Sequence, residues 1–195
     1  MAKLYFSYAA MNAGKSTILL QAAHNYRERG MDVLLLTSEL YGGTEDGHIS
    51  SRIGISSEAT LYSDTVDLFA LVQDVMAKGR LDAIFVDEAQ FLTKQQVWQL
   101  ARVTDYLHVP VLAYGLRTDF RGELFEGSAA LLAIADNLRE IRTICECGSK
   151  ATMVVRLGPD GKALTEGDQV SIEKTTYLSL CRRHWEERMG RFPTG

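Results

Sequence analysis

The segment that most constrains the fold is an apolar stretch that runs through small residues into Gly-Lys-Ser. The apolar part, Leu4 to Tyr8, predicts a strand, and Gly14, Lys15 and Ser16 precede a helical pattern. This layout is typical of a phosphate-binding P-loop, in which backbone N–H groups of the turn and of the helix N-terminus bind the oxygens of a polyphosphate. We expect Lys15 to reach the terminal phosphates and the Ser16 hydroxyl to bind Mg²⁺.

The pattern departs from the usual G-x-x-x-x-G-K-[ST] at its first position, which is Ala9. Glycine supplies backbone conformations that alanine resists, so the alternative is a chance Gly-Lys-Ser at the start of a helix. The strand before it, the helix after it and an acidic signature downstream favour the P-loop. The predicted loop comprises Ala9, Ala10, Met11, Asn12, Ala13, Gly14, Lys15, Ser16 and Thr17.

Length and composition indicate one principal domain with a small appendage. The chain has 195 residues, of which 46% are hydrophobic, so it can bury a proper core. Its net charge of -4 is spread without a block of like charges, so we expect no nucleic-acid polymer as a partner. No apolar run approaches the ~20 residues that span a bilayer, and a strand begins almost at once, so we expect a cytoplasmic enzyme without a membrane anchor.

Alternation of apolar strands with amphipathic helices predicts a parallel α/β sheet flanked by helices. A helix over 17–29 and a buried strand over 32–37 complete a βαβ unit with the first strand. Asp64 is the expected N-cap of the next helix, which ends at Gly79, and Thr93 with Gln96 predicts a capping box. The remaining expected elements are strands at 81–86 and 109–114, a helix ending before Pro110, an irregular loop at 115–125, a helix at 128–135, and a closing segment at 137–144.

Residues 39–57 are predicted to form a long loop, because they are rich in glycine and serine and poor in large apolar groups. Arg52 is the only arginine or lysine in this loop. It could contact phosphate, or it could be an ordinary solvated arginine.

An acidic pair follows the buried strand Ile84-Phe85-Val86. In a parallel sheet the carboxyl ends of the strands face the ligand crevice, so Asp87 and Glu88 should meet the P-loop there. We expect Asp87 to complete the Mg²⁺ site with Ser16 and Glu88 to accept a proton. The alternative is that both acids serve the N-terminus of the following helix, but Thr93 already supplies that cap.

Three classes of P-loop protein could carry these motifs. A GTP-binding switch normally carries Asn-Lys-x-Asp, which is absent from the sequence. A helicase-like ATPase motor would match the run Asp87 to Gln90, with Glu88 activating water. Such a motor moves along nucleic acid, however, and the short acidic chain shows no sign of a surface that would bind it. A kinase for a small hydroxyl-bearing substrate fits best, since a carboxylate can take the proton of the attacking hydroxyl.

The last fifty residues predict a zinc site. Cys145 and Cys147 form one cluster, and Cys181 and His184 form a second. Two such clusters can close a tetrahedral zinc site with no open position, which makes the metal structural. A Cys145–Cys147 disulfide would leave Cys181 unexplained. Because the chain changes to short segments and turns after residue 144, we expect a P-loop domain over 1–144 and a zinc-binding subdomain over 145–195.

These motifs resemble the type II thymidine kinase family in order and spacing. The resemblance rests on 11–17, on Asp87-Glu88-Ala89-Gln90-Phe91, on 115–120 and on the cysteine and histidine set. It implies a P-loop NTPase fold of the RecA-like kind, and transfer of the γ-phosphate of ATP to the 5′-hydroxyl of thymidine or deoxyuridine. It also implies a homotetramer, feedback inhibition by thymidine triphosphate, and a place for Asp87, Glu88, Ala89 and Gln90 beside the nucleotide.

The resemblance also assigns residues to the nucleoside. Glu88 matches the general base, and Tyr177 matches the tyrosine of a lasso loop that reads the edge of thymine. Aromatic faces suit a flat base, since stacking contributes ~1 to 3 kcal/mol; the alternative for Phe91 and Phe125 is plain core packing. The implied nucleoside set is Met11, Glu88, Phe91, Leu116, Phe120, Phe125, Val170, Ile172 and Tyr177.

Overall fold

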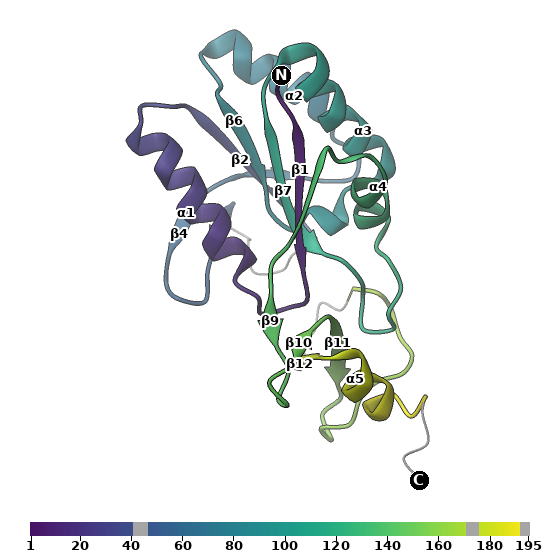
Figure 1. Cartoon of the computed structure of the whole chain (residues 1–195). Coiled ribbons are helices and arrows are strands. Elements are labelled where there is room, and N and C mark those ends of the chain that lie inside the picture. The colour runs from purple at the N-terminus through teal and green to yellow at the C-terminus, as the bar shows by residue number, and fades with distance from the viewer. Residues whose placement is uncertain (41–46, 171–175, 192–195) are drawn as a thin grey trace.

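A six-stranded, all-parallel sheet forms the centre of the molecule (Figure 1). The computed structural model describes residues 1–40, 47–170 and 176–191. The strand order is β5-β2-β6-β7-β1-β8. The strands are β1 (Leu4–Ala9), β2 (Val33–Ser38), β5 (Thr60–Tyr62), β6 (Ala83–Val86), β7 (Val111–Leu116) and β8 (Asn137–Glu140). The predicted parallel α/β sheet is therefore confirmed.

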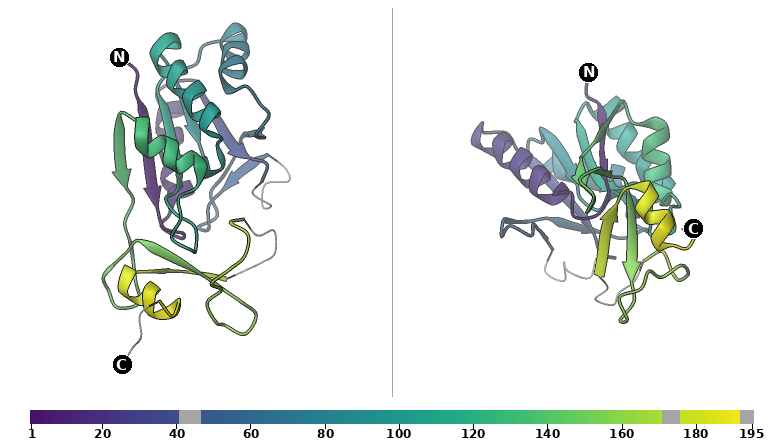
Figure 2. Two further views of the ribbon diagram at one scale, coloured as in Figure 1. Left: turned by 90° about the vertical axis from the view of Figure 1, so that its right-hand side faces the viewer. Right: turned by 60° about the horizontal axis from the view of Figure 1, so that its bottom comes forward.

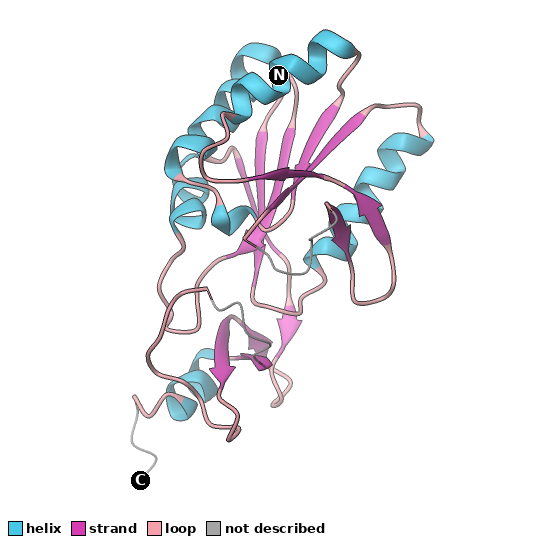
Figure 3. Cartoon of the chain, turned by 180° about the vertical axis from the view of Figure 1, so that it is seen from behind, coloured by secondary structure: helices cyan, strands magenta, loops and turns pink. Residues whose placement is uncertain are grey.

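Helices cover both faces of this sheet, which explains why its central strands are continuously apolar. On one face α1 (Lys15–Glu28) packs through Leu19 and Ala23 against Phe85 of β6. On the other face lie α2 (Leu68–Lys78), α3 (Lys94–Arg102) and α4 (Glu126–Ile134), as Figure 3 shows. Successive residues of β6 alternate between the two clusters, with Ile84 and Val86 in one and Phe85 in the other. This strand thus contributes to two cores at once.

Local capping signals place most helix ends where the sequence predicts them. The capping box at α3 is complete, because Thr93 accepts from the Gln96 N–H and Gln96 accepts from the Thr93 N–H. The expected cap at Asp64 is wrong: α2 begins after Asp67, whose carboxylate accepts from the N–H groups of Phe69 and Ala70. A π-helical segment, η2 (Val103–Leu107), continues α3 toward Pro110.

The predicted loop at 39–57 is only partly irregular. Its described part contains a hairpin of β3 (His48–Ser50) and β4 (Ser56–Glu58). Ile49 is buried against the α1 side of the core. This one apolar side chain fixes a segment whose composition otherwise predicts a loop. Arg52 lies in the turn of this hairpin. The short strand β5 that follows is also absent from the sequence prediction, and it forms one edge of the main sheet.

A small C-terminal region lies below the carboxyl ends of the central strands (Figures 1 and 2). It contains β9 (Thr143–Ile144) paired with β10 (Lys150–Ala151), β11 (Met153–Leu157) paired with β12 (Thr176–Leu180), and α5 (Arg182–Arg188). Its core is small and contains Cys145, Val155 and Trp185. None of the helices formed by the described residues is long and apolar enough to cross a membrane.

Candidate active site and metal centre

The P-loop leaves β1 at Ala9 and enters α1 at Lys15. Positive φ angles occur at Asn12 (61°) and Gly14 (80°). Ala9 instead pairs with Leu116 of β7 as the last residue of an extended strand, so this position does not require glycine. The left-handed residue Gly14 immediately precedes the helix, which is the backbone arrangement that turns N–H groups toward an anion.

Lys15 is buried at the start of α1, with 8% of its surface exposed. Its Nζ donates to the Ala10 carbonyl over 3.3 Å. Burial lowers the pKa of Lys15, while the negative charges of Glu88 and Asp87 raise it and the positive charge of Arg52 lowers it. The ammonium therefore shares one electrostatic environment with the acidic pair and with the hairpin turn.

Asp87 follows β6 and is buried at the same edge of the sheet. Its Oδ1 accepts no hydrogen bond from any residue that the structure describes. Burial, together with the charge of Glu88, raises the pKa of this carboxyl to about 7, and a hydrogen bond from the Ser16 side chain opposes the rise. The two predicted Mg²⁺ ligands, Ser16 and Asp87, are thus within hydrogen-bond reach. An orphaned carboxylate oxygen beside a hydroxyl fits a hard divalent cation.

Glu88 is the only one of the two acids that is partly exposed. It adopts a left-handed backbone (φ 52°, ψ 37°) at the start of η1 (Ala89–Phe91). Its carbonyl accepts from the Tyr62 hydroxyl over 3.3 Å, and its Oε2 accepts from the Gln90 carboxamide. Burial raises the pKa of Tyr62 well above its ordinary value, and the charges of Glu88 and Asp87 raise it further. A non-glycine residue in this conformation persists only when its surroundings hold it there.

The predicted aromatic residues gather on the loop between β7 and α4 and on η1. Phe91 is half-buried and meets Phe125 edge to face, with ring centroids 5.9 Å apart. Phe120 and Phe125 are buried. Leu116 ends β7, is half-buried, and donates its N–H to the Gln90 side chain. Phe91 and Phe125 therefore lie beside the acidic turn, although the contact of any of the three rings with a nucleoside stays a prediction.

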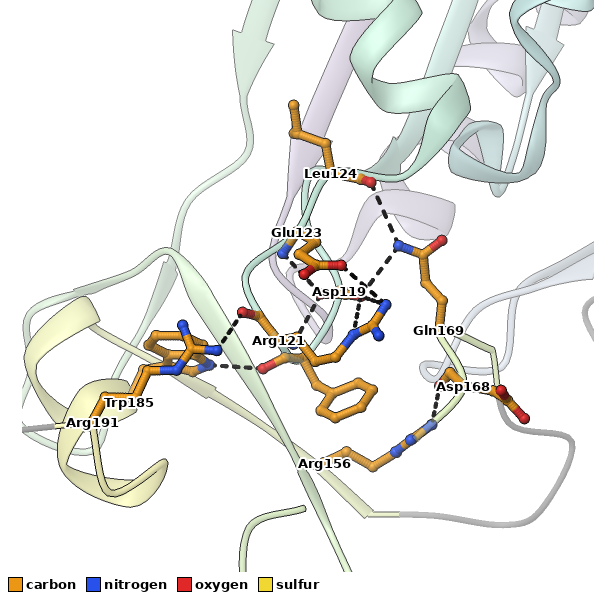
Figure 4. Close-up of polar contacts among 10 residues, drawn as sticks. Asp119, Arg121, Glu123, Leu124, Arg156, Asp168, Gln169, Trp185 and Arg191 are labelled. Atoms are coloured by element: carbon orange, nitrogen blue, oxygen red, sulfur yellow. Dashed lines mark hydrogen bonds and ion pairs between the residues drawn. The ribbon is translucent and has the colours of Figure 1, made fainter. Parts of the chain in front are cut away.

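Figure 4 shows that the loop carrying Asp119 and Arg121 is held by the C-terminal region. The Trp185 indole N–H donates to the carbonyls of Phe120 and Val154, both over 3.0 Å. The buried Asp119 carboxylate accepts from Arg121 and from the Gln169 side chain. This network joins two parts of the chain that are far apart in sequence, and the sequence pattern carried no signal for it.

Arg156 of β11 stacks on the same aromatic residue. Its guanidinium carbon lies 3.9 Å from the centroid of the Phe120 ring, a cation–π contact. Its Nη1 donates to the Asp168 carbonyl over 2.9 Å, while its buried Nε has no partner within residues 1–40, 47–170 and 176–191. A buried arginine is rare unless it is paired, and Arg156 is paired with both the Phe120 ring and the Asp168 carbonyl. Arg156 therefore links Phe120 to the segment that precedes residue 170.

Of the remaining predicted nucleoside residues, Tyr177 lies on β12. Tyr177 is half-buried and pairs with Arg156, and Val170 is exposed. Ile172 lies outside the described residues. The Ser179 hydroxyl donates to the Met11 carbonyl, which links β12 directly to the P-loop. This link across 168 positions of sequence is not visible in any local pattern.

Cys145, Cys147, Cys181 and His184 meet in one cluster, as the sequence predicts. Their ligand atoms all lie within 4.8 Å of one another. The sulfurs of Cys147 and Cys181 are 3.9 Å apart, and the Cys145 sulfur lies 3.2 Å from Nδ1 of His184. Ligands at tetrahedral corners around zinc, with bonds of about 2.3 Å to sulfur, lie roughly 3.8 Å apart. The donor set and its spacing therefore fit a closed, structural zinc site.

The parallel sheet, the P-loop at its carboxyl edge and the adjacent acidic pair define the P-loop NTPase class. One solved structure, described as an ATPase domain, shares this fold with a TM-score of 0.50 at 13% identity, covering 94% of this chain and 82% of that one. That likeness concerns the fold alone.

The family follows from sequence comparison. The thymidine kinase family model matches residues 2–185. A thymidine kinase of Mesorhizobium japonicum is 62% identical over 191 residues, covering 98% of this chain and 94% of that relative. A thymidine kinase of Ruegeria pomeroyi is 60% identical over 191 residues, covering 97% of this chain and 96% of that relative. The chain belongs to the thymidine kinase family, a family of ATP-dependent nucleoside kinases.

Proposed function

We propose that this chain transfers the γ-phosphate of ATP to the 5′-hydroxyl of thymidine, or of deoxyuridine, to give the 5′-monophosphate. One observation carries the proposal: the P-loop residues Lys15 and Ser16 share one sheet edge with Asp87 and Glu88. There Lys15 interacts with the charges of both acids, and the Ser16 side chain interacts with Asp87. Phosphoryl transfer needs little more than positioning and charge stabilisation, which this arrangement can supply.

The phosphate side is formed by the P-loop, with the acidic turn 87–90 beside it. The N–H groups around Gly14 and the Lys15 ammonium bind the phosphate oxygens. Ser16 and Asp87 would hold Mg²⁺, for which the unpartnered Oδ1 of Asp87 is the best support within the described residues. When bound, the cation neutralises charge on the phosphate oxygens. Asp87 must be ionised to bind it, so cation binding also draws the proton from this carboxyl.

Glu88 is the general base of the proposed reaction. The oxygen of the sugar hydroxyl bonds to the γ-phosphorus as the bond to the β-phosphate oxygen breaks and ADP leaves. The hydroxyl must lose its proton in this step, and a carboxylate within hydrogen-bond reach can accept it. Glu88 is partly exposed, whereas Asp87 beside it is buried. The two neighbouring acids therefore have different surroundings, which suits a proton acceptor and a metal ligand respectively.

The nucleoside occupies the region between the acidic turn and β12. Phe91 offers partly exposed aromatic surface, and we assign the buried rings of Phe120 and Phe125 to the wall of this region. Met11 and Leu116 lie where the P-loop adjoins the end of β7. Val170, Ile172 and Tyr177 belong to the lasso that reads the base. The contacts of Phe120 with Trp185 and Arg156 support this placement, because they hold the wall of a binding region in a fixed orientation.

Arg52 is proposed as a second phosphate contact. The hairpin that carries it is fixed against α1, since Ile49 is buried there and Arg27 donates to the Ser57 hydroxyl over 3.0 Å. The positive charge of Arg52 reaches Lys15. Two cations that repel one another across a P-loop are stabilised when a polyphosphate binds both.

We further propose, from the change to short segments and turns after residue 144, a division into a kinase domain (1–144) and a zinc subdomain (145–195). The family resemblance supports a homotetramer in nucleotide salvage, with thymidine triphosphate as feedback inhibitor. The charge distribution and the apolar pattern of the sequence support a cytoplasmic enzyme without a nucleic-acid polymer or a membrane as partner. Zinc stabilises the subdomain, since the core around Cys145 and Trp185 is small and metal binding contributes directly to folding.

The direct test is transfer of labelled γ-phosphate from ATP and Mg²⁺ to a panel of nucleosides. We expect labelled thymidine 5′-monophosphate, a smaller or equal yield from deoxyuridine, and no stimulation of hydrolysis by DNA or RNA. Hydrolysis that rises with nucleic acid, without a nucleoside product, would instead indicate an ATPase motor.

A further inference from the structure

Gln90 sits between the acidic turn and β7 and is hydrogen-bonded on both sides. Its Oε1 accepts the Leu116 N–H over 2.9 Å, and its Nε2 donates to Oε2 of Glu88. A backbone N–H can only donate and a carboxylate can only accept, so the orientation of the carboxamide is determined by its neighbours. Gln90 therefore presents its NH₂ group, and not its oxygen, to Glu88.

Close packing prevents this carboxamide from turning away. Gln90 is buried, with 2% of its surface exposed. A Cβ at Gly115 would lie 2.9 Å from both the N and the Oε1 of Gln90, and a Cβ at Gly127 would lie 2.6 Å from the carbonyl oxygens of Ala89 and Leu92. The turn is thus wedged between β7 and α4 at positions where only glycine fits without displacement.

Glu88 has a competing partner. Its charge acts on the buried Lys15 ammonium, the group expected to bind phosphate. A carboxylate that swung onto Lys15 would be paired with a cation and turned toward the phosphate side. The hydrogen bond from Gln90 opposes that movement. The left-handed backbone of Glu88 and the hydrogen bond from Tyr62 to its carbonyl fix the position of the backbone from which the side chain extends.

We propose that Gln90 is a positioning residue for Glu88, an inference that rests on the proposed kinase function. Its carboxamide, oriented by the Leu116 N–H, holds Oε2 of Glu88 and leaves Oε1 to receive the proton of the substrate hydroxyl. The side chain of Gln90 thereby acts on the reaction through Glu88, in addition to its predicted place beside the nucleotide.

The test compares Gln90→Met with Gln99→Met in steady-state transfer from ATP to thymidine. Gln99 is a matched control, because it is also buried and its Oε1 accepts a backbone N–H, that of Leu68, over 3.0 Å. In both variants a methionine of nearly the same volume replaces a buried glutamine, so each variant loses a carboxamide without leaving a large cavity. We expect Gln90→Met to lower kcat by on the order of 10- to 100-fold with thymidine KM changed less than about threefold, as for a misplaced reacting group. Gln99→Met should keep kcat.

A double-mutant cycle with Glu88→Gln separates positioning from general damage. If Gln90 acts through Glu88, Gln90→Met should lower kcat by no more than about threefold once Glu88→Gln is present. An active parent whose kcat survives Gln90→Met, or equal losses in both backgrounds, overturns the role of Gln90 while the kinase function stands. A parent that transfers no phosphate to thymidine overturns the proposed function and this role together.

Discussion

Replacing Asp87 with asparagine should stabilise the nucleotide-free, Mg²⁺-free protein at alkaline pH while removing its activity. Burial raises the pKa of Asp87 to about 7 in the folded protein, whereas the ordinary value is 3.8. The folded state therefore keeps a proton that the unfolded chain loses. Stability from this group is fully present below pH 4 and is lost as the pH rises to about 7.

The size of the effect follows from the same linkage. Between pH 5 and pH 8 the ionisation of Asp87 should lower the free energy of unfolding by about 2 to 3 kcal/mol. An asparagine side chain at this position cannot ionise, so the difference between Asp87→Asn and the parent should grow by that amount over the same range. Below pH 4 the difference should become independent of pH. The difference in stability grows with pH because the parent then carries a buried, charged Asp87 carboxylate with no cation bound to it.

Urea unfolding at a series of pH values, with zinc retained and Mg²⁺ absent, measures this difference. Asp105→Asn is the control, because Asp105 is exposed on η2 and its replacement should leave the pH dependence of the parent unchanged. Saturating Mg²⁺ and ATP should restore stability to the parent at pH 8 and give much less to Asp87→Asn. A difference that stays constant from pH 5 to pH 8 would refute the reasoning.

Three further predictions concern other parts of the site. Removing zinc with a chelator should speed amide hydrogen exchange over 176–189 and raise the KM for thymidine. A zinc-free protein with full stability and nucleoside affinity would show that the nucleoside site does not depend on the zinc cluster. Trp185→Phe should lower the free energy of unfolding by about 1 to 3 kcal/mol in chemical denaturation, because the carbonyls of Phe120 and Val154 lose their donor. A change below the error of the measurement would show that these two hydrogen bonds do not stabilise the fold. Arg52→Ala should weaken kcat/KM for ATP by about 10-fold or more, as expected for a lost charged hydrogen bond; unchanged turnover and ATP affinity would make Arg52 a solvated residue.

The parts of this protein that the sequence predicts are those governed by short-range patterns. The P-loop and the acidic pair each follow an apolar strand, and parallel strands bring their carboxyl ends together whatever the intervening chain does. The Thr93 capping box is likewise local, since both of its bonds join Thr93 and Gln96. The cysteine and histidine cluster follows from ligand chemistry, because zinc needs these side chains at a narrow range of separations.

The parts that the sequence does not predict depend on contacts made far along the chain. Asp64 and Asp67 are both plausible caps, and only the packing of Leu68, which donates its N–H to Gln99, selects Asp67. The β3–β4 hairpin has little apolar content of its own and is fixed by Ile49 against α1. The contacts of Phe120 with Trp185 and Arg156 join segments far apart in the chain, beyond the reach of any periodic pattern.

The central claim is that Glu88 takes the proton of a nucleoside hydroxyl at the edge of the sheet where Lys15 and Asp87 bind magnesium triphosphate. Single-turnover transfer of labelled phosphate from ATP to thymidine, in the parent and in Glu88→Gln, tests it most directly when the affinities for ATP and thymidine are measured alongside. We expect the variant to bind both ligands with affinities close to those of the parent and to lose on the order of 10²- to 10⁴-fold in the rate of transfer. Transfer at the rate of the parent, with both ligands bound, would contradict the account.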